Sequence, residues 1–131
     1  MRYDAFISYS HAADDLLAPR LQDVLQRFGR PWYRRRALSV FRDRTGLSAN
    51  PGLWTSIVEA LDDSEWFILL ASPEAAASPW VNREVEHWIE ARGTANVLVV
   101  LTEGTWLWDG PTGRFDPRST AVPPALVTAF V

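Results

Sequence analysis

Apolar and polar positions divide the first hundred residues into four short apolar runs and three longer segments of helical periodicity. The runs, at residues 3–8, 37–41, 66–71 and 96–101, predict strands, and the third is apolar enough for a parallel strand covered on both faces. Between them, apolar residues recur at helical spacing over 17–28, 54–61 and 78–92. This alternation predicts an α/β fold, with a parallel sheet and helices on both faces.

Capping signals predict where two of these helices begin and end. Ser78 and Pro79 form an N-cap followed by proline at the first helical position, and Gly93 stops the same helix. Asp14 and Asp15 are candidate N-caps for the helix over 17–28.

The regular pattern stops after residue 101. Residues 102–131 hold many Gly and Pro residues together with Trp106 and Trp108, and only 125–131 has the composition of a helix start. Four strands are placed and a fifth is not evident. We therefore expect residues 1–131 to be one domain with an irregular tail, cut from a longer protein before its last strand. The fourth strand would then be a bare edge that favours pairing between copies.

Composition and charge exclude several classes of protein. The chain has no Cys and two His, which argues against disulfides and against thiolate or His-rich metal sites. It has no Lys, which excludes a Walker A phosphate loop. The net charge is −3, and the seven arginines between 27 and 44 are interpreted as a solvated surface, so we expect no nucleic-acid partner.

The chain also lacks the signals of a membrane or secreted protein. No apolar run approaches the roughly 20 residues of a membrane span, and the first residues lead directly into a strand pattern. We expect a cytoplasmic domain with no membrane partner.

Ligands of open α/β sheets bind beyond the carboxyl ends of the strands. That rule selects residues 9–11, 42–52, 72–79 and the stretch after 101. Trp80 and Glu84 stand four residues apart on the helix that starts at this edge, so they share one face and should project toward the cleft. An aromatic plate beside a carboxylate suits a ring-bearing cationic ligand, although such a pair is more often structural.

Other polar residues are less promising. Ser48 lies in half of a nucleophile elbow without the strand-to-helix turn, and is interpreted as a loop hydroxyl. Asp4 is interpreted as a buried carboxylate that caps nearby backbone. His87 follows Glu84 on the same face, within reach of a supporting role, but is interpreted as a solvent-facing side chain.

Four segments in order resemble the conserved boxes of TIR domains: YDAFISYS at 3–10, LSVFRD at 38–43, WFILLASP at 66–73 and SPWVNRE at 78–84. The last resembles the W-x-x-x-E segment, and residues 42–52 would be the family's BB loop. PWYRRR at 31–36 is similar to bacterial TIR proteins that carry further domains. The resemblance implies a flavodoxin-like, five-stranded parallel sheet and a role in bacterial defence or signalling.

The resemblance also implies an activity, the cleavage of NAD at the nicotinamide–ribose bond. Glu84 would be the catalytic residue, NAD the substrate, and neither a cofactor nor a metal is implied. Where some active members have an acidic BB-loop residue, this chain has Ser48. The residues implied to contact NAD are Trp80, Tyr9, Ser10, His11, Phe41, Asp43 and Ser48.

The chemistry supports this interpretation of Glu84. Nicotinamide in NAD is already a cationic leaving group, so the difficult event is the growth of positive charge on the ribose, as in glycoside cleavage. A desolvated carboxylate near that ribose would stabilise the charge. Water would give ADP-ribose, and attack by the adenine ring would give a cyclic form.

Two alternatives stay open. The domain would be either a non-catalytic module that binds other TIR domains through the BB loop and helices, or a nucleotide sensor without turnover. We expect self-association in each case, with residues 42–52 mobile and controlling assembly or access. We also expect Glu84 to be an exposed cleft carboxylate whose loss costs the fold little.

Overall fold

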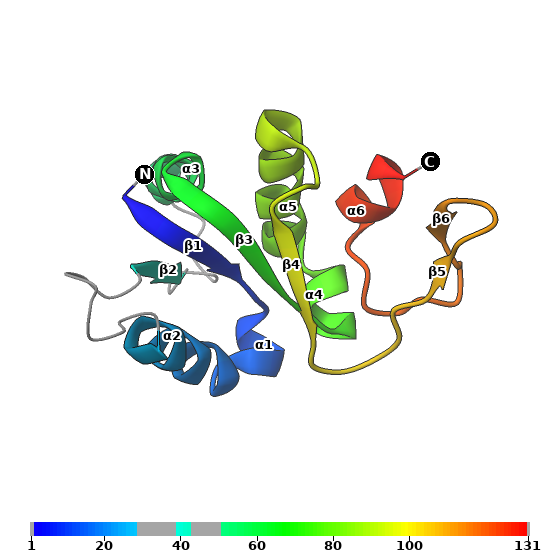
Figure 1. Ribbon diagram of the computed structural model, residues 1–131, viewed down its shortest axis with the longest axis horizontal. Helices are drawn as coiled ribbons and strands as arrows, with labels where there is room; N and C mark the ends of the chain where they lie inside the picture. The colour runs from blue at the N-terminus through cyan, green and yellow to red at the C-terminus, as the bar shows by residue number, and fades with distance from the viewer. Residues whose placement is uncertain (1, 29–38, 43–50, 131) are drawn as a thin grey trace.

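The computed structural model describes residues 2–28, 39–42 and 51–130, without the side chains of Phe28 and Pro51. Each of the first three strands of the described chain is followed by one or two helices (Figure 1). In order, the elements are β1 (Tyr3–Ser8), α1 (His11–Asp14), α2 (Leu17–Phe28), β2 (Val40–Arg42), α3 (Pro51–Asp62), β3 (Ser64–Ala71), α4 (Pro73–Ala77), α5 (Pro79–Arg92), β4 (Val97–Leu101), β5 (Trp108–Asp109), β6 (Arg114–Phe115) and α6 (Pro124–Ala129).

The main sheet has the order β2-β1-β3-β4, and all its strand pairs are parallel. Ala5 of β1 lies opposite Val40 on one side and Trp66 on the other, so β1 is a central strand. Because parallel strands point the same way, the carboxyl ends of all four strands meet at one edge. This arrangement confirms the predicted flavodoxin-like class, with β2 beginning three residues later than expected.

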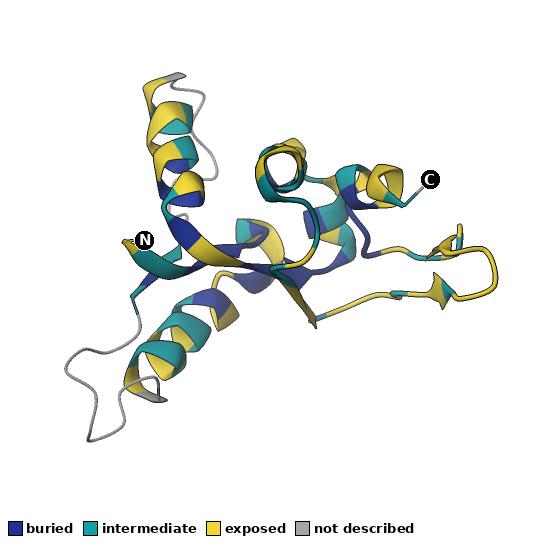
Figure 2. Cartoon of the chain, turned by 45° about the horizontal axis from the view of Figure 1, so that its top comes forward, coloured by how far each residue is buried: buried dark blue, intermediate teal, exposed yellow. Residues whose placement is uncertain are grey.

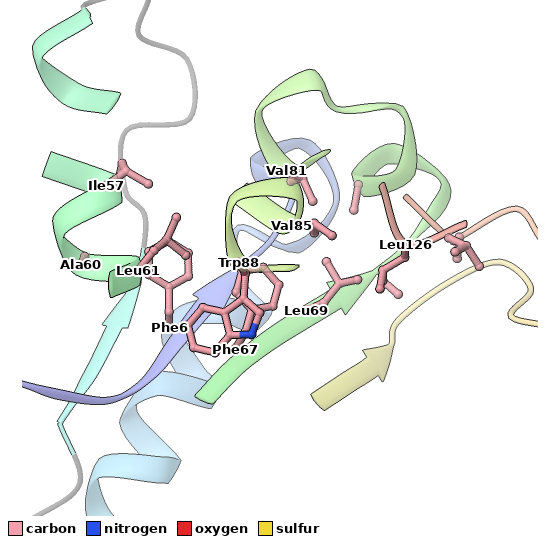
Figure 3. Close-up of a cluster of buried hydrophobic side chains, with 14 of the residues drawn as sticks. Phe6, Ile57, Ala60, Leu61, Phe67, Leu69, Val81, Val85, Trp88 and Leu126 are labelled. Carbon is pink, nitrogen blue, oxygen red and sulfur yellow. The ribbon is translucent and has the colours of Figure 1, made fainter. Parts of the chain in front are cut away.

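Helices cover both faces of the sheet and create two separate cores. Figure 1 shows α2 on one side of the strands and α3 and α5 on the other. On the α3/α5 side, Phe6 and Phe67 stack with centroids 5.9 Å apart, and Trp88 packs against Phe67 (Figure 3). On the α2 side, Ile7 and Leu70 pack with residues of α2. Since side chains alternate along a strand, neighbouring residues of β1 serve different cores.

The caps predicted for α5 are confirmed. The Ser78 hydroxyl accepts a hydrogen bond from the Val81 N–H at 3.2 Å, and Pro79 begins the helix. Gly93 ends it with a φ of 75°, in the left-handed region that favours glycine. These caps set the first turn of α5 at the ligand edge of the sheet.

The capping role predicted for Asp14 and Asp15 is wrong. Asp14 is the last residue of α1, and Asp15 is the C-cap of that short helix. The buried Asp14 carboxylate instead lies 3.1 Å from the Thr102 hydroxyl. It therefore links the segment after β1 to the end of β4, a long-range contact that no local pattern contains.

Residues 102–130 form a small unit beside the sheet. The two-residue strands β5 and β6 pair antiparallel, and aromatic rings from Trp108, Phe115 and Phe130 meet edge to face. The α6 helix, expected from the composition of 125–131, packs on α5, with the Ala125 N–H donating to Asn82 Oδ1 at 2.7 Å. Figure 2 shows the arm that carries the hairpin mostly exposed.

The β4 strand lies at one edge of the sheet, and no described strand pairs with its outer side. Leu98, Val99, Val100 and Leu101 are all exposed. On the α2 side, Leu98 joins Trp66 and Leu25 in an open apolar groove. Over the residues described, no helix has both the length and the apolar character needed to cross a bilayer.

Candidate active site

Glu84 lies on the second turn of α5, over the face of the sheet, with its carboxylate against the end of β1. The Ser8 hydroxyl donates to Glu84 Oε1 at 2.8 Å, between residues 76 positions apart in the chain. Ser8 is 0% exposed and Glu84 is 1% exposed. The structure thus buries the predicted catalytic carboxylate and gives it a neutral hydrogen-bond donor.

The expectation that Glu84 is exposed is wrong. Only the first turn of α5 stands at the sheet edge, and the second turn already lies over β1. Glu84 follows Val81 by three residues and precedes Trp88 by four, so it belongs to the buried face of the helix. That spacing was available in the sequence and would have indicated the burial.

Trp80 lies on the first turn of α5 and is half-buried against α3. Its ring meets the Trp54 ring edge to face, with centroids 5.6 Å apart. The guanidinium carbon of Arg83 lies 4.0 Å from the Trp54 ring centroid. In the sequence, Trp54 is only part of the apolar face of a predicted helix. The structure shows that it packs against Trp80 and supports its position.

Phe41 lies on β2 and faces the same core. Its ring stacks on Phe6 at 5.2 Å and meets Tyr3 edge to face at 5.2 Å. Its partners place it in the cluster that also holds the inward faces of α3 and α5. The structure therefore brings Phe41, Trp80, Ser8 and Glu84 to one side of the sheet.

The residues that follow Ser8 point elsewhere. Tyr9 belongs to the core on the α2 side, and its hydroxyl accepts a hydrogen bond from Arg42 Nη1 at 3.0 Å. The rings of Tyr9 and His11 lie 4.5 Å apart, and His11 Nδ1 is 3.2 Å from Asp15 Oδ1. The carbonyl of Ser10 accepts the first N–H bonds of α1. These three residues stand at the ligand edge, but Tyr9 is on the face opposite to Glu84.

Several residues considered in the sequence have defined structural partners. The Ser39 N–H donates to Asp4 Oδ2 at 2.7 Å, which confirms that Asp4 caps backbone. His87 Nε2 lies 2.7 Å from Asp62 Oδ1, joining α5 to α3. Asp43, Ser48, the loop interior at 43–50 and most of the arginine cluster lie outside the described residues. Within the described ranges, no three His, Asp or Glu side chains gather as a metal site would need.

Asp14, at the ligand edge, has a carboxyl group whose pKa is shifted. Burial raises the pKa of this carboxyl above the ordinary 3.8, the Thr102 hydrogen bond opposes the shift, and the charges of Glu74 and Glu103 add to it. Burial is thus the main reason why ionisation of Asp14 is disfavoured, and the nearby charges of Glu74 and Glu103 contribute less.

The fold is that of a flavodoxin-like α/β domain, because the parallel sheet has the order β2-β1-β3-β4 and helices cover both of its faces. The candidate site lies at the strand ends, where a carboxylate contacts the end of β1. The chain belongs to the TIR family, since a family model described as TIR domain matches residues 5–119.

The chain is similar to one curated protein in sequence and to one solved structure in fold. The chain is 62% identical to "NAD(+) hydrolase ApTIR" of an Actinoplanes species, over 99% of this chain and 18% of that protein. It therefore spans about a fifth of the length of this curated relative. The TIR domains of the activated Roq1 resistosome superpose with a TM-score of 0.56 at 20% identity, covering 75% of this chain and 55% of that one. The second likeness shows the fold alone.

Proposed function

We propose that this domain cleaves NAD at the nicotinamide–ribose bond, with the Glu84 carboxylate as its catalytic group. The observation that carries the proposal is a buried carboxylate held by Ser8 on the helix that starts at the ligand edge. The 62% identity to a protein named as an NAD(+) hydrolase supports the same activity.

The reaction needs electrostatic stabilisation more than proton transfer. When the glycosidic C–N bond breaks, its electron pair goes to the nicotinamide nitrogen, which becomes neutral and leaves without a proton. Positive charge grows on the ribose, and a carboxylate in a site shielded from water stabilises that charge more strongly than one in solvent. Water then bonds to the ribose carbon and loses a proton, giving ADP-ribose, or a ring nitrogen of adenine attacks and gives a cyclic form.

The aromatic residues on the α3/α5 side supply surfaces for the nicotinamide half. In this proposal Trp80 stacks on or shapes the nicotinamide site, and Phe41 lies near the ribose. Tyr9, Ser10 and His11 line the neighbouring edge, and Asp43 and Ser48 complete the contacts from the BB loop. NAD is the substrate, and no further cofactor is required.

We further propose that the domain acts in the cytoplasm, where NAD is available, in bacterial defence or signalling. Self-association through the BB loop and helices would bring copies together, and other TIR domains or further domains of the whole protein would be its partners. No contact with nucleic acid or membrane is part of this function.

The test is release of nicotinamide from NAD by the whole protein, measured at high protein concentration. We expect turnover by the wild type and a loss of about a hundredfold or more in Glu84→Gln, the size seen when a transition-state electrostatic contact is removed. Glu86→Gln, an exposed residue two positions further along α5, is the matched control and should keep its activity.

Three outcomes would contradict the proposal. Full turnover by folded Glu84→Gln would remove Glu84 from catalysis. A wild-type protein that assembles but releases no nicotinamide would favour the non-catalytic interaction module, and one that binds NAD without turnover would favour the sensor.

A further inference from the structure

We infer that Ser8 is a positioning residue for Glu84: its hydroxyl fixes the carboxylate in the orientation that cleavage requires. The inference rests on the proposed function and deepens it. Its observation is the 2.8 Å hydrogen bond from Ser8 Oγ to Glu84 Oε1 between two side chains that solvent does not reach.

Ser8 is well placed to act as an anchor. It is the last residue of β1, the strand that pairs with both β2 and β3, and it lies opposite Leu69 in the middle of the sheet. A glutamate side chain has three rotatable bonds, so α5 alone does not fix where its carboxylate oxygens lie. A hydrogen bond from a rigid neighbouring strand fixes one oxygen and, through the planar carboxylate, restricts the other.

The chemical nature of the donor also suits the reaction. A hydroxyl supplies one O–H donor and no charge, whereas an arginine would bring a positive charge to the same place. Ser8 therefore offsets part of the cost of burying Glu84 without placing a positive charge beside its carboxylate. An ionised carboxylate accepts about four hydrogen bonds, so the bond to Ser8 does not exhaust it.

The position of Ser8 is otherwise unfavourable for a polar residue. Two positions before it on the same face is Phe6, which is fully buried among aromatic rings. A hydroxyl at such a site costs free energy unless it is hydrogen-bonded. Glu84 is the partner that the structure gives to this hydroxyl, so the contact accounts for a buried polar group at this position of β1.

A purely structural role predicts a different result from a positioning role. If Ser8 only stabilised the fold, its replacement would lower the melting temperature and leave the kinetics of folded molecules unchanged. If Ser8 held NAD directly, the replacement would raise KM. A residue that orients the catalytic carboxylate instead lowers kcat with little change in KM.

The experiment compares Ser8→Ala with Ser64→Ala in the whole protein by steady-state kinetics on NAD. Ser64 is the matched control, because it is a buried serine at the opposite end of the same sheet, where it begins β3. Its hydroxyl donates to the Ala60 carbonyl of α3. For Ser8→Ala we expect kcat per folded molecule to fall about tenfold or more, the size of one hydrogen bond to a charged group, with KM within about twofold. Ser64→Ala should keep the wild-type kcat.

Rescue tests the hydroxyl itself. Ser8→Thr keeps the donor and should recover kcat to within about threefold of wild type, and Ser8→Cys, a weaker donor, should fall between alanine and serine. If Ser8→Ala does not fold, the test compares kcat per folded molecule between the wild type and Ser8→Cys, and we expect the cysteine variant to be slower. A cysteine variant as active as wild type would then overturn the inference.

The inference and the proposed function fail in different ways. Wild-type kcat in folded Ser8→Ala, or an equal loss in Ser64→Ala, overturns the role of Ser8 while Glu84→Gln remains inactive. A wild type that does not cleave NAD overturns the proposed function, and the role of Ser8 with it.

Discussion

The ring of Trp80 meets the ring of Trp54 edge to face, with centroids 5.6 Å apart and ring planes at 80°. Trp80 lies on the first turn of α5, and Trp54 lies on the first turns of α3. Arg83 covers the Trp54 ring at 4.0 Å. These contacts tie the two helices together beside the ligand edge, so the position of Trp80 depends on a residue that need not touch the substrate.

Replacing Trp54 should therefore weaken NAD binding through Trp80. We expect Trp54→Ala to raise KM for NAD by about two- to tenfold, the equivalent of one aromatic pair, with a smaller effect on kcat. Trp54→Phe keeps a ring at the contact and is the control, with KM near that of the wild type. An unchanged KM in folded Trp54→Ala would show that NAD binding by Trp80 does not depend on its contact with Trp54.

Glu84→Ala should cost more stability than Glu84→Gln. Alanine leaves a cavity at a 1% exposed site and deprives the Ser8 hydroxyl of its acceptor, whereas glutamine keeps the volume and an oxygen for Ser8. We expect the free energy of unfolding to fall by about 1–3 kcal/mol more in the alanine variant. Urea denaturation of both variants measures the difference, and equal midpoints would argue against a packed, hydrogen-bonded carboxylate.

Asp14 should make the domain less stable at neutral pH than at acidic pH. Burial raises its pKa in the fold above the 3.8 of an ordinary aspartate, so above 3.8 the folded state holds this proton more tightly than the unfolded chain. Stability contributed by the protonated form is lost as pH rises through the folded pKa. We expect Asp14→Asn to raise the melting temperature at pH 7, with the gain vanishing below pH 3.8.

Asp23→Asn is the control for this experiment, because Asp23 is an exposed partner of Arg27 on α2. Its melting temperature should follow the wild type at each pH. A gain for Asp14→Asn that persists undiminished in acid would mean that the amide improves packing and that the carboxyl is not penalised for its charge.

Gly104 should tolerate a side chain less well than Gly113. Both have φ in the left-handed region, at 84° and 67°. A Cβ on Gly104 would lie 2.7 Å from Thr120 Oγ1 and 2.9 Å from Pro73 Cγ, whereas nothing lies within 4 Å of one on Gly113. We expect Gly104→Ala to cost about 2–4 kcal/mol, from strain and overlap, and Gly113→Ala about 1–2 kcal/mol, from strain alone. Equal unfolding midpoints for the two variants would contradict this order.

Local patterns predicted most of the sheet and its helices. The strands, the serine cap of α5 and its glycine stop depend on neighbouring residues, so sequence reasoning found them. The β5–β6 hairpin was missed because two-residue strands have no detectable alternation. Asp14 was misread because its partner, Thr102, is 88 positions away.

The candidate site was only partly predictable for the same reason. The place of Glu84 on α5 followed from the sequence, and its burial would have followed from its spacing to Val81 and Trp88. The contacts Ser8–Glu84 and Trp54–Trp80 join different elements and are set by how α3 and α5 pack on the sheet. Tyr9 follows Ser8 directly, and alternation along the chain sends it to the face opposite Glu84.

That alternation has a consequence for how β1 pairs. In the observed register Ser8 lies opposite Leu69, and its hydroxyl meets Glu84. A slip of one position would exchange the two faces of the strand, presenting the phenol of Tyr9 to the carboxylate and sending the Phe6 ring to the wrong layer. Such a molecule would keep its secondary structure and its size, yet it would have no aligned glutamate. Specific activity would therefore measure the fraction of molecules in which β1 has the native register. Circular dichroism and gel filtration would not distinguish these molecules from the others.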